Sequence, residues 1–286
     1  MINCDIYAGQ IPDDVHDQKA TEAGRLDAAF AWPSGIEVDE MGNLWVGDYA
    51  NWSLRFVPPT GPTSTLPCYD SAKLDRRNDR QSAAWSYPEP IGVLDQQSIA
   101  VRSVNGHDVF ALRSDGTSKL MWRFGGRRSV VGVRRGPRGH LYALVNEDQT
   151  GSILRLDPGG RSEPIAKLEC RYAALDADHD VLWFRHESGV TTWTLEAGLE
   201  ELVIQQGDWG LNSEIVGLAV DAQKRLYVVE IHSGVLRIDQ DGSVNRVVEM
   251  QRGGNGIAIG PCGRLFVSSG ELGMILRSTD PVSDSE

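Results

Sequence analysis

Long apolar runs are absent from this chain, so it offers no helical segment able to span a bilayer. Nothing at its start has the pattern of a signal peptide, and we therefore expect a cytoplasmic protein. Positive charge is also scarce, because 28 lysines and arginines stand against 40 aspartates and glutamates, a net charge of −12. Since phosphate binding needs a basic surface, this composition disfavours a nucleic-acid partner.

Cysteine is rare too, and the spacing of Cys4, Cys68, Cys170 and Cys262 has no metal-binding pattern. We interpret the four as ordinary thiols in a reducing compartment. The chain also contains neither a glycine-rich phosphate loop nor a nucleophile elbow. Any chemistry must therefore come from residues that are scattered along the sequence.

Short segments of alternating polarity are what the chain does contain. Residues 35–39 (GIEVD), 43–48 (NLWVGD) and 53–57 (SLRFV) each alternate at period two, and glycine, asparagine and proline bound them. This pattern predicts three short antiparallel strands and not a helix.

The same unit recurs six times, mostly about 40 residues apart, a period typical of propeller blades. One such sheet is too small to bury its own faces, so a ring of six supplies the core and residues 1–286 form a single domain. The six copies lie at residues 35–57, 98–112, 130–144, 173–184, 217–239 and 256–277.

Together with residues 24–33, the first copy closely resembles the NHL repeat, and the fifth and sixth copies also match it well. The resemblance implies an all-β, six-bladed β-propeller of four-stranded antiparallel blades, whose strands a to d run outward from the axis. It implies no single activity, because a fold does not fix a function.

The two ends of the chain suggest how the ring closes. Residues 1–9 hold a lone strand, and the last copy lacks its strand d, so we predict that the N-terminal strand completes the last blade. We expect residues 279–286 to be a frayed tail. In blade two, residues 125–129 leave room only for a very short strand d, or none.

Connection lengths distinguish the two faces of the predicted ring. The a–b and c–d turns are short, and we call their side the short-turn face. Three d–a connections are long, at residues 10–32, 69–97 and 206–216, and they define the long-loop face. Long loops on a tight scaffold usually carry function, so we expect the working site there.

Aligning the copies places one ring of side chains at the ends of the b strands and a second ring just before the a strands. The first ring is Asp48, Arg113, Val145, His186, Glu230 and Ser269, and the second is Ser34, Gln97, Ser129, Arg171, Val216 and Asn255. We predict acid–base catalysis by Glu230, His232 and His186. The predicted substrate-binding residues are Arg113, Arg171, Asp48, Tyr49, Trp85, Tyr87, Trp209, Asn255 and His16. Among these, the arginines would hold a carboxylate or an enolate-like oxygen, whereas the NHL pattern also allows Asp48 a purely structural role.

Residues 229–238 (VEIHSGVLRI) resemble part of the streptogramin lyase repeat. That resemblance implies that Glu230 and His232 act with Mg²⁺ in an elimination that opens a lactone. Gluconolactonase-type propellers bind a metal through residues before the a strands, where only Asn255 matches here. Amidating lyases use three histidines on zinc, but His16, His186 and His232 lack a zinc-type spacing. We therefore expect no cofactor, although a divalent metal stays open.

The leading hypothesis is a small-molecule enzyme, a lyase or cyclase acting on a natural-product-like substrate at the long-loop face. The rival hypothesis is a non-catalytic propeller that binds a peptide or protein there. A sugar-binding role would suit the aromatic residues, but paired carboxylates at a clear spacing are missing. We expect a monomer without a membrane or nucleic-acid partner.

Overall fold

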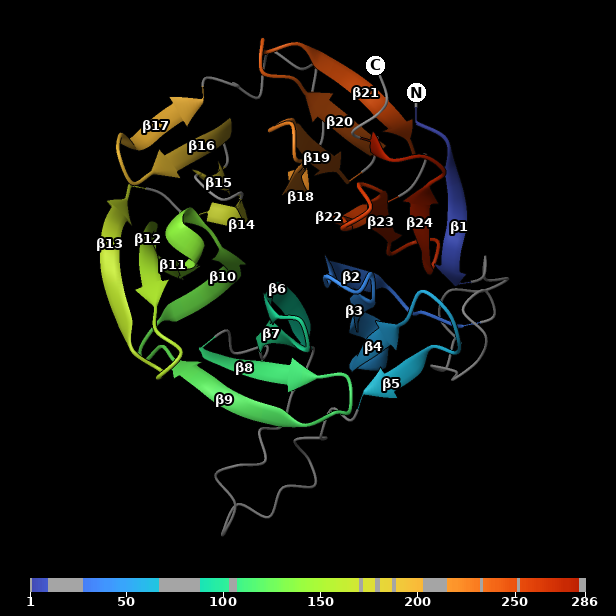
Figure 1. The fold of residues 1–286 in the computed structure, drawn as a ribbon, viewed down its shortest axis with the longest axis horizontal. Coiled ribbons are helices and arrows are strands. Elements are labelled where there is room, and N and C mark those ends of the chain that lie inside the picture. Colours follow the sequence, from blue (N-terminus) through green and yellow to red (C-terminus); the bar gives the residue numbers. More distant parts are fainter. Residues whose placement is uncertain are drawn as a thin grey trace.

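The structure is a computed structural model that describes residues 2–9, 28–66, 88–102, 107–169, 172–177, 181–186, 189–202, 215–231, 234–250 and 253–282. In these residues, 24 strands form six four-stranded antiparallel sheets around a central axis (Figure 1). The prediction of an all-β, six-bladed propeller is confirmed.

Each sheet is one blade, with strand a next to the axis and strand d at the rim. Blade one consists of β2 (Pro33–Val38), β3 (Leu44–Asp48), β4 (Ser53–Val57) and β5 (Ser64–Leu66). Blade two consists of β6 (Glu89–Asp95), β7 (Ser98–Arg102), β8 (Asp108–Arg113) and β9 (Ser118–Arg123). Blade three consists of β10 (Arg128–Arg135), β11 (Leu141–Glu147), β12 (Thr150–Leu156) and β13 (Ser162–Leu168).

The other half of the ring repeats this plan. Blade four consists of β14 (Tyr172–Ala177), β15 (Val181–His186), β16 (Gly189–Thr194) and β17 (Gly198–Leu202). Blade five consists of β18 (Ile215–Val220), β19 (Leu226–Glu230), β20 (Gly234–Ile238) and β21 (Val244–Glu249). Blade six consists of β22 (Gly254–Ile259), β23 (Leu265–Ser269), β24 (Met274–Ser278) and β1 (Cys4–Gly9).

The hydrophobic core lies between the blades. Trp45 and Leu54 of blade one, for example, pack in one cluster with Ile99 and Phe110 of blade two. Similar clusters of buried side chains join each of the other neighbouring pairs. A single blade exposes two apolar faces, so closing the ring is what removes them from water.

The predicted closure by the N-terminal strand is confirmed. β1 pairs antiparallel with β24, and Figure 1 shows it along the outer edge of blade six. Tyr7 of β1 packs edge-on against Phe266, with ring centroids 5.1 Å apart. Asp5 forms an ion pair with Arg277 of β24 at 3.2 Å.

The expectation of a frayed tail is wrong for residues 279–282. Val282 is buried, and its backbone N–H donates to the Gly263 carbonyl at 2.8 Å. Its own carbonyl accepts from Arg225 of blade five. Residues 283–286 lie outside the described residues.

The strand assignment predicted for blade two is wrong by one strand. The segments expected as its strands a and b are β7 and β8, which are strands b and c. Strand a is β6, inside the stretch predicted as a long loop at residues 69–97, and the doubtful strand d is the complete β9. Gly92 explains why β6 was missed: a Cβ there would meet the Val133 carbonyl at 1.7 Å, so β6 needs a glycine that interrupts its apolar pattern.

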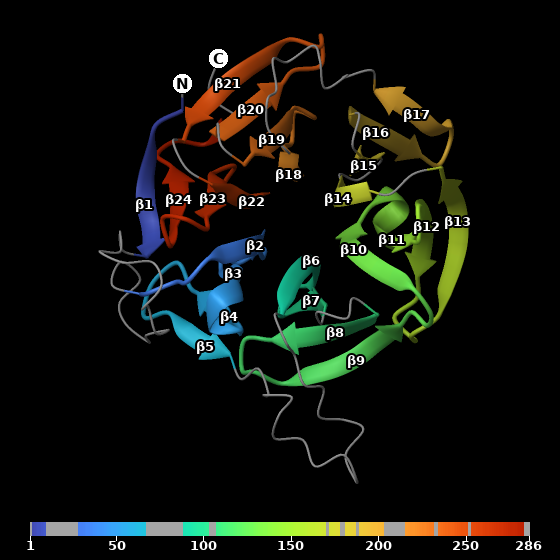
Figure 2. The same cartoon turned by 180° about the vertical axis from the view of Figure 1, so that it is seen from behind.

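Figure 2 shows the ring from the opposite side, and the six a strands surround the axis in both views. We find no helix in the described residues with the length and hydrophobicity of a membrane crossing. Cys4 and Cys262 are free thiols, whereas Cys68 and Cys170 lie outside the described residues.

Candidate functional site

The axis of the propeller contains a buried ionic cluster centred on Arg134 of β10. Its Nη2 lies 2.8 Å from Glu37 Oε1 of β2, and its Nε lies 2.9 Å from Asp176 Oδ1 of β14. Blades one, three and four thus each contribute one charged side chain to this cluster.

Backbone groups extend the cluster to two more blades. Arg134 Nη1 donates to the Ile91 carbonyl of blade two at 2.7 Å and to the Val133 carbonyl at 3.1 Å. The Val220 N–H of blade five donates to Asp176 Oδ2 at 2.8 Å. The guanidinium is therefore fixed in place by partners on several sides.

Burial and the neighbouring charges act against each other on these groups. Burial raises the pKa of Glu37 to about 7 against the opposing charge of Arg134, and the neighbouring Asp176 carboxylate adds to the rise. Burial alone would lower the pKa of Arg134, but Glu37 and Asp176 outweigh it and raise that pKa. Glu37 is thus a carboxyl group that exchanges a proton near neutrality beside a permanent cation.

Arg134 separates two cavities along the axis. The one toward the long-loop face has a volume of about 80 Å³, and Glu89, Val131 and Asn255 are among the residues that line it. The one that opens at the short-turn face has about 480 Å³. Glu37 and Arg134 line both cavities, so a molecule in either cavity can reach these two side chains.

A second carboxylate–guanidinium pair lies above the small cavity. Arg102, at the end of β7, pairs with Glu89 at the start of β6, and its Nε donates to Glu89 Oε2 at 2.9 Å. Arg102 Nη1 also donates to the Val130 carbonyl of blade three at 2.6 Å. The side chains of both partners are about a third exposed or less, at 26% for Arg102 and 35% for Glu89.

Asp48 lies at the end of β3 as predicted, and protein groups contact both of its carboxylate oxygens. Its Oδ1 accepts from the Ala31 N–H at 2.7 Å, and its Oδ2 accepts from Asn51 Nδ2 at 2.8 Å. Arg55 lies 3.6 Å from Oδ2, and both charged side chains are fully buried. Burial raises the pKa of Asp48 to about 6, although Asn51, Ala31 and Arg55 oppose the rise.

Glu230 ends β19 at the aligned position in blade five, also as predicted. Only 1% of its side chain is exposed, and Oε2 lies 3.4 Å from Arg246 Nη2 of β21. A carboxylate in this position needs a movement of its neighbours before it can contact a substrate.

Aromatic side chains gather at the corner where blade one meets the long-loop face. Trp32, Tyr49 and Trp52 are exposed by 42%, 50% and 52%, respectively. Trp32 and Trp52 both have positive φ, at 60° and 53°, which is uncommon for a bulky residue and frequent at functional sites. With its amide oxygen turned toward the indole, Asn255 accepts from Trp32 Nε1 at 3.1 Å.

Arg113 does not belong to the predicted ring. Because β8 is strand c of blade two, Arg113 ends that strand at the short-turn face, and Val101 is the residue aligned with Asp48. Gln97, predicted for the second ring, likewise lies in the a–b turn. His107 lies in the b–c connection of blade two, and its ring nitrogen Nδ1 contacts the Arg128 carbonyl.

The structure brings together only part of the predicted site. Asp48, Tyr49, Glu230 and Asn255 all lie at the long-loop face, and His186 ends β15, where its backbone pairs with Tyr172. The remaining predicted residues lie outside the described residues: His16, Trp85, Tyr87, Arg171, Trp209 and His232. Within the described residues, no three His, Cys, Asp or Glu side chains gather as a metal site.

Sequence reasoning missed the axial cluster, although the aligned repeats carry a signal for it. Glu37, Arg134 and Asp176 each stand opposite the aromatic residue of strand b in their own blade. Blades five and six have alanine there, at Ala219 and Ala258. Opposite charges at a position that is otherwise small and apolar predict contact across the axis.

Comparisons with solved structures find other propellers at low identity. Virginiamycin B lyase from Staphylococcus aureus is 13% identical with a TM-score of 0.61, and the match covers 96% of this chain and 99% of that one. A gluconolactonase from Xanthomonas campestris is 15% identical with a TM-score of 0.64, over 87% and 86% of the two chains. A luciferin-regenerating enzyme is 14% identical with a TM-score of 0.63, over 88% and 92%.

At these identities the similarity shows the fold alone. No family model matches the chain, and no curated protein does. The NHL resemblance is therefore not confirmed by a family match. The propeller architecture that it implied is confirmed by the structure itself.

Proposed function

We propose that the protein is a small-molecule enzyme, an acid–base lyase or cyclase whose substrate enters from the long-loop face. The observation that carries this proposal is the Glu37 carboxyl group, whose pKa lies at about 7 and which is held against the fixed guanidinium of Arg134. Groups with such perturbed proton affinity in a cavity are candidates for general acid–base catalysis.

In this reaction, Glu37 removes a proton from the carbon next to a carbonyl or lactone group. The electron pair forms a carbon–carbon double bond, the bond to the leaving oxygen breaks, and Glu37 returns its proton to that oxygen. The fixed positive charge of Arg134 stabilises the negative charge that develops on oxygen. Arg102, which is closer to the long-loop face, is placed to attract an anionic part of the substrate.

The size of the cavity constrains the substrate. A volume of about 80 Å³ accommodates the reacting carbonyl group and its neighbours, but not a whole natural product. The body of the substrate must therefore lie further out at the long-loop face. Glu230, His186 and His232 stay as the alternative acid–base residues. Propellers of known structure that act on small molecules, such as virginiamycin B lyase, support the enzyme class at low identity.

The test starts from a thermal-shift screen of lactones, polyketides and peptides, followed by turnover of the ligands that stabilise the protein. We expect Glu37→Gln to lower turnover by about 10²–10⁴-fold, the usual contribution of a general acid–base group. For a base of this pKa, kcat/KM of the wild type should rise with pH and level off above about 7. Glu249→Gln, an exposed change on β21, is the matched control and should leave turnover unchanged.

Normal turnover by a folded Glu37→Gln variant would contradict the assignment of Glu37. If Glu230→Gln alone abolished turnover, the catalytic residues would instead be those at the ends of the b strands. If no ligand of the screen were converted, the rival function would gain support.

That rival is a scaffold that binds a peptide or protein through the aromatic corner of Trp32, Tyr49 and Trp52. Exposed aromatic residues are enriched at binding interfaces, which is the observation in its favour. Selection of peptides from a displayed library, with Trp52→Ala as the counter-screen, tests it. Peptides that bind the variant as well as the wild type would contradict this function.

A further inference from the structure

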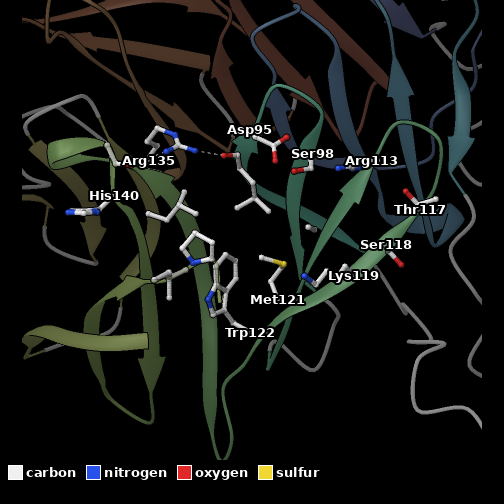
Figure 3. A pocket seen from close by; sticks show the side chains of 16 residues that line it. Asp95, Ser98, Arg113, Thr117, Ser118, Lys119, Met121, Trp122, Arg135 and His140 are labelled. Carbon is white, nitrogen blue, oxygen red and sulfur yellow. Dashed lines mark hydrogen bonds between the residues drawn. The ribbon is translucent and has the colours of Figure 1, made fainter. Parts of the chain in front are cut away.

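A groove of about 680 Å³ lies at the short-turn face, between blades two and three and away from the axis (Figure 3). Blade two contributes the end of β6 and one face of the β8–β9 hairpin. Blade three contributes the start of β11 and the end of β12. The volume lies in the range of pockets that enclose small organic molecules.

The apolar wall of the groove is rigid. Trp122 of β9 is buried to 2% exposure, and its Nε1 donates to the Asp157 carbonyl of blade three at 3.1 Å. Leu94, Leu141 and Leu156 are buried in the same cluster, with Met121 packed against it. A flat apolar ligand would therefore meet a surface whose shape is already fixed.

Positive charge lines one side of this wall. Arg113 of β8 lies opposite Thr117 in the hairpin, and Lys119 follows two residues later on β9. Side chains two residues apart on a strand share a face, so Arg113 and Lys119 both point into the groove with Met121. Figure 3 shows Lys119 and Met121 next to each other on this hairpin.

These cations differ from most arginines of the molecule. Arg123, Arg128 and Arg155, for example, each pair with a carboxylate. Within the described residues, the side chains of Arg113 and Lys119 make no hydrogen bond or ion pair. The groove also holds Arg135 but only one acid, Asp95, in a chain whose net charge is −12.

The nearby acids are engaged by their own turns. Asp95 Oδ1 accepts from the Gln97 N–H at 2.8 Å. Asp115, next to Arg113 along the chain, accepts from the backbone and the hydroxyl of Thr117 at 2.8 and 2.6 Å. The hydrogen bonds from Thr117 and, after them, the charge of Arg113 lower the pKa of Asp115, but no hydrogen bond or ion pair joins either carboxylate to Arg113 or Lys119 in the described residues.

Arg135 holds the two blades at a fixed separation. Its Nη1 donates to the Gly139 carbonyl of blade three at 2.8 Å, and its Nη2 donates to the Leu94 carbonyl of blade two. The second of these bonds is drawn as a dashed line across the groove in Figure 3. The groove is thus preformed, which lowers the cost of binding.

We propose that this groove binds a small amphipathic anion: an organic carboxylate whose planar apolar body lies against Met121, which the buried Trp122 supports from behind, while Arg113 and Lys119 hold the charged group. The cations border an apolar wall instead of converging on one point, so the geometry suits a carboxylate on a hydrophobic body better than an inorganic anion.

The probe for this site is 2-naphthoate, with neutral 2-naphthamide as the matched ligand, titrated into the full chain by calorimetry. We expect wild type to bind the carboxylate at least about tenfold more tightly than the amide, since hydrogen bonds to charged groups are worth that much or more. Arg113→Gln and Lys119→Gln should each weaken naphthoate binding by about tenfold.

Lys167→Gln, an exposed change on the outer strand β13, is the matched protein control and should bind naphthoate as the wild type does. All three substitutions are at exposed positions, so the melting temperature should stay close to that of the wild type. The proposal is overturned if naphthoate does not bind at millimolar concentration, if the amide binds equally well, or if Lys167→Gln weakens binding as much as Lys119→Gln does.

Discussion

Glu37 shows how strongly one position depends on the rest of the ring. Its strand alternates like the a strands of the other blades, where the aligned residues include Ala219 and Ala258. A carboxyl group at this place loses its hydration, and the burial that raises its pKa to about 7 follows from its place on the axis. The cost is offset in part by Arg134.

The raised pKa of Glu37 makes the stability of the protein depend on pH. The folded state holds the Glu37 proton more tightly than the unfolded state does, so the contribution of this group is greatest below about pH 4.5 and is lost as pH rises to about 7. A single group of this kind contributes a slope of at most about 1.4 kcal/mol per pH unit. We therefore expect Glu37→Gln to flatten the fall of the unfolding free energy across this window.

Urea unfolding of both proteins at several values between pH 4 and 8 measures this slope. Glu249→Gln serves as the control, because its side chain is exposed on β21. An identical pH dependence of the wild type and Glu37→Gln would show that the pKa of Glu37 is not raised.

At the scale of the strand, β1 is a short element with a large structural role. Tyr7 and Ala8 are buried, and Tyr7 packs on Phe266 and lies under the Arg277 guanidinium at 4.9 Å from the ring centroid. The strand also covers the hydrogen-bonding edge of β24, which would otherwise be open to pairing with other chains.

Deleting residues 1–9 should therefore lower the free energy of unfolding by much more than a typical substitution on the surface does. Losing the buried Tyr7 side chain alone is worth about 3 kcal/mol, judged from truncations of buried aromatic residues. We expect a melting temperature several degrees lower and more aggregation, measured by calorimetry and light scattering. Asp5→Asn, which removes only the ion pair to Arg277, should cost less than about 1 kcal/mol.

A truncated protein that melts like the wild type would contradict this role of β1. It would mean that blade six is stable with three strands.

Sequence patterns predicted the strands well where the pattern is regular and failed where close packing interrupts it. Blades one, five and six follow the predicted order a to c, because their alternation and turns are clear. In blade two, β6 carries Pro90 and Gly92 with two register shifts, so it resembles a loop. Alternation alone cannot distinguish a pair of strands a and b from a pair b and c.

At the scale of the whole molecule, the Arg134 cluster connects five of the six blades through side chains and backbone groups. The sixth blade is joined to the first nearby, where Ser268 Oγ donates to the Ser34 carbonyl at 2.6 Å. The a strands are therefore fixed to one another by polar contacts as well as by the apolar clusters between blades.

Arg134→Met should destabilise the protein by about 3–5 kcal/mol, because it leaves two carboxyl groups buried without their cation. Arg161→Met, an exposed change in a c–d turn, should have little effect on the unfolding free energy measured in urea. The double variant Glu37→Gln, Arg134→Met should lose less than the sum of the two single changes, since the residues are in contact.

If Arg134→Met unfolded at the same urea concentration as the wild type, the cluster would not stabilise the ring. Full additivity of the two changes would contradict their coupling.

This cluster also marks where prediction from sequence stops. The ends of the b strands were placed well enough to identify Asp48 and Glu230 as members of one ring. Their burial and the convergence of Glu37, Arg134 and Asp176 depend on how six separate sheets meet. No local pattern contains that information, because the contacts join residues about 40 to 100 positions apart.

The pairing of β1 with β24 has a consequence for synthesis on the ribosome. Asp5 and Arg277 are 272 residues apart, so β1 has to wait until β24 is made before it finds its partner. During that time its apolar side chains and the unfinished ring stay open to solvent and to chaperones. The propeller can therefore close only after β24 has been synthesised, whatever the order in which the inner blades fold.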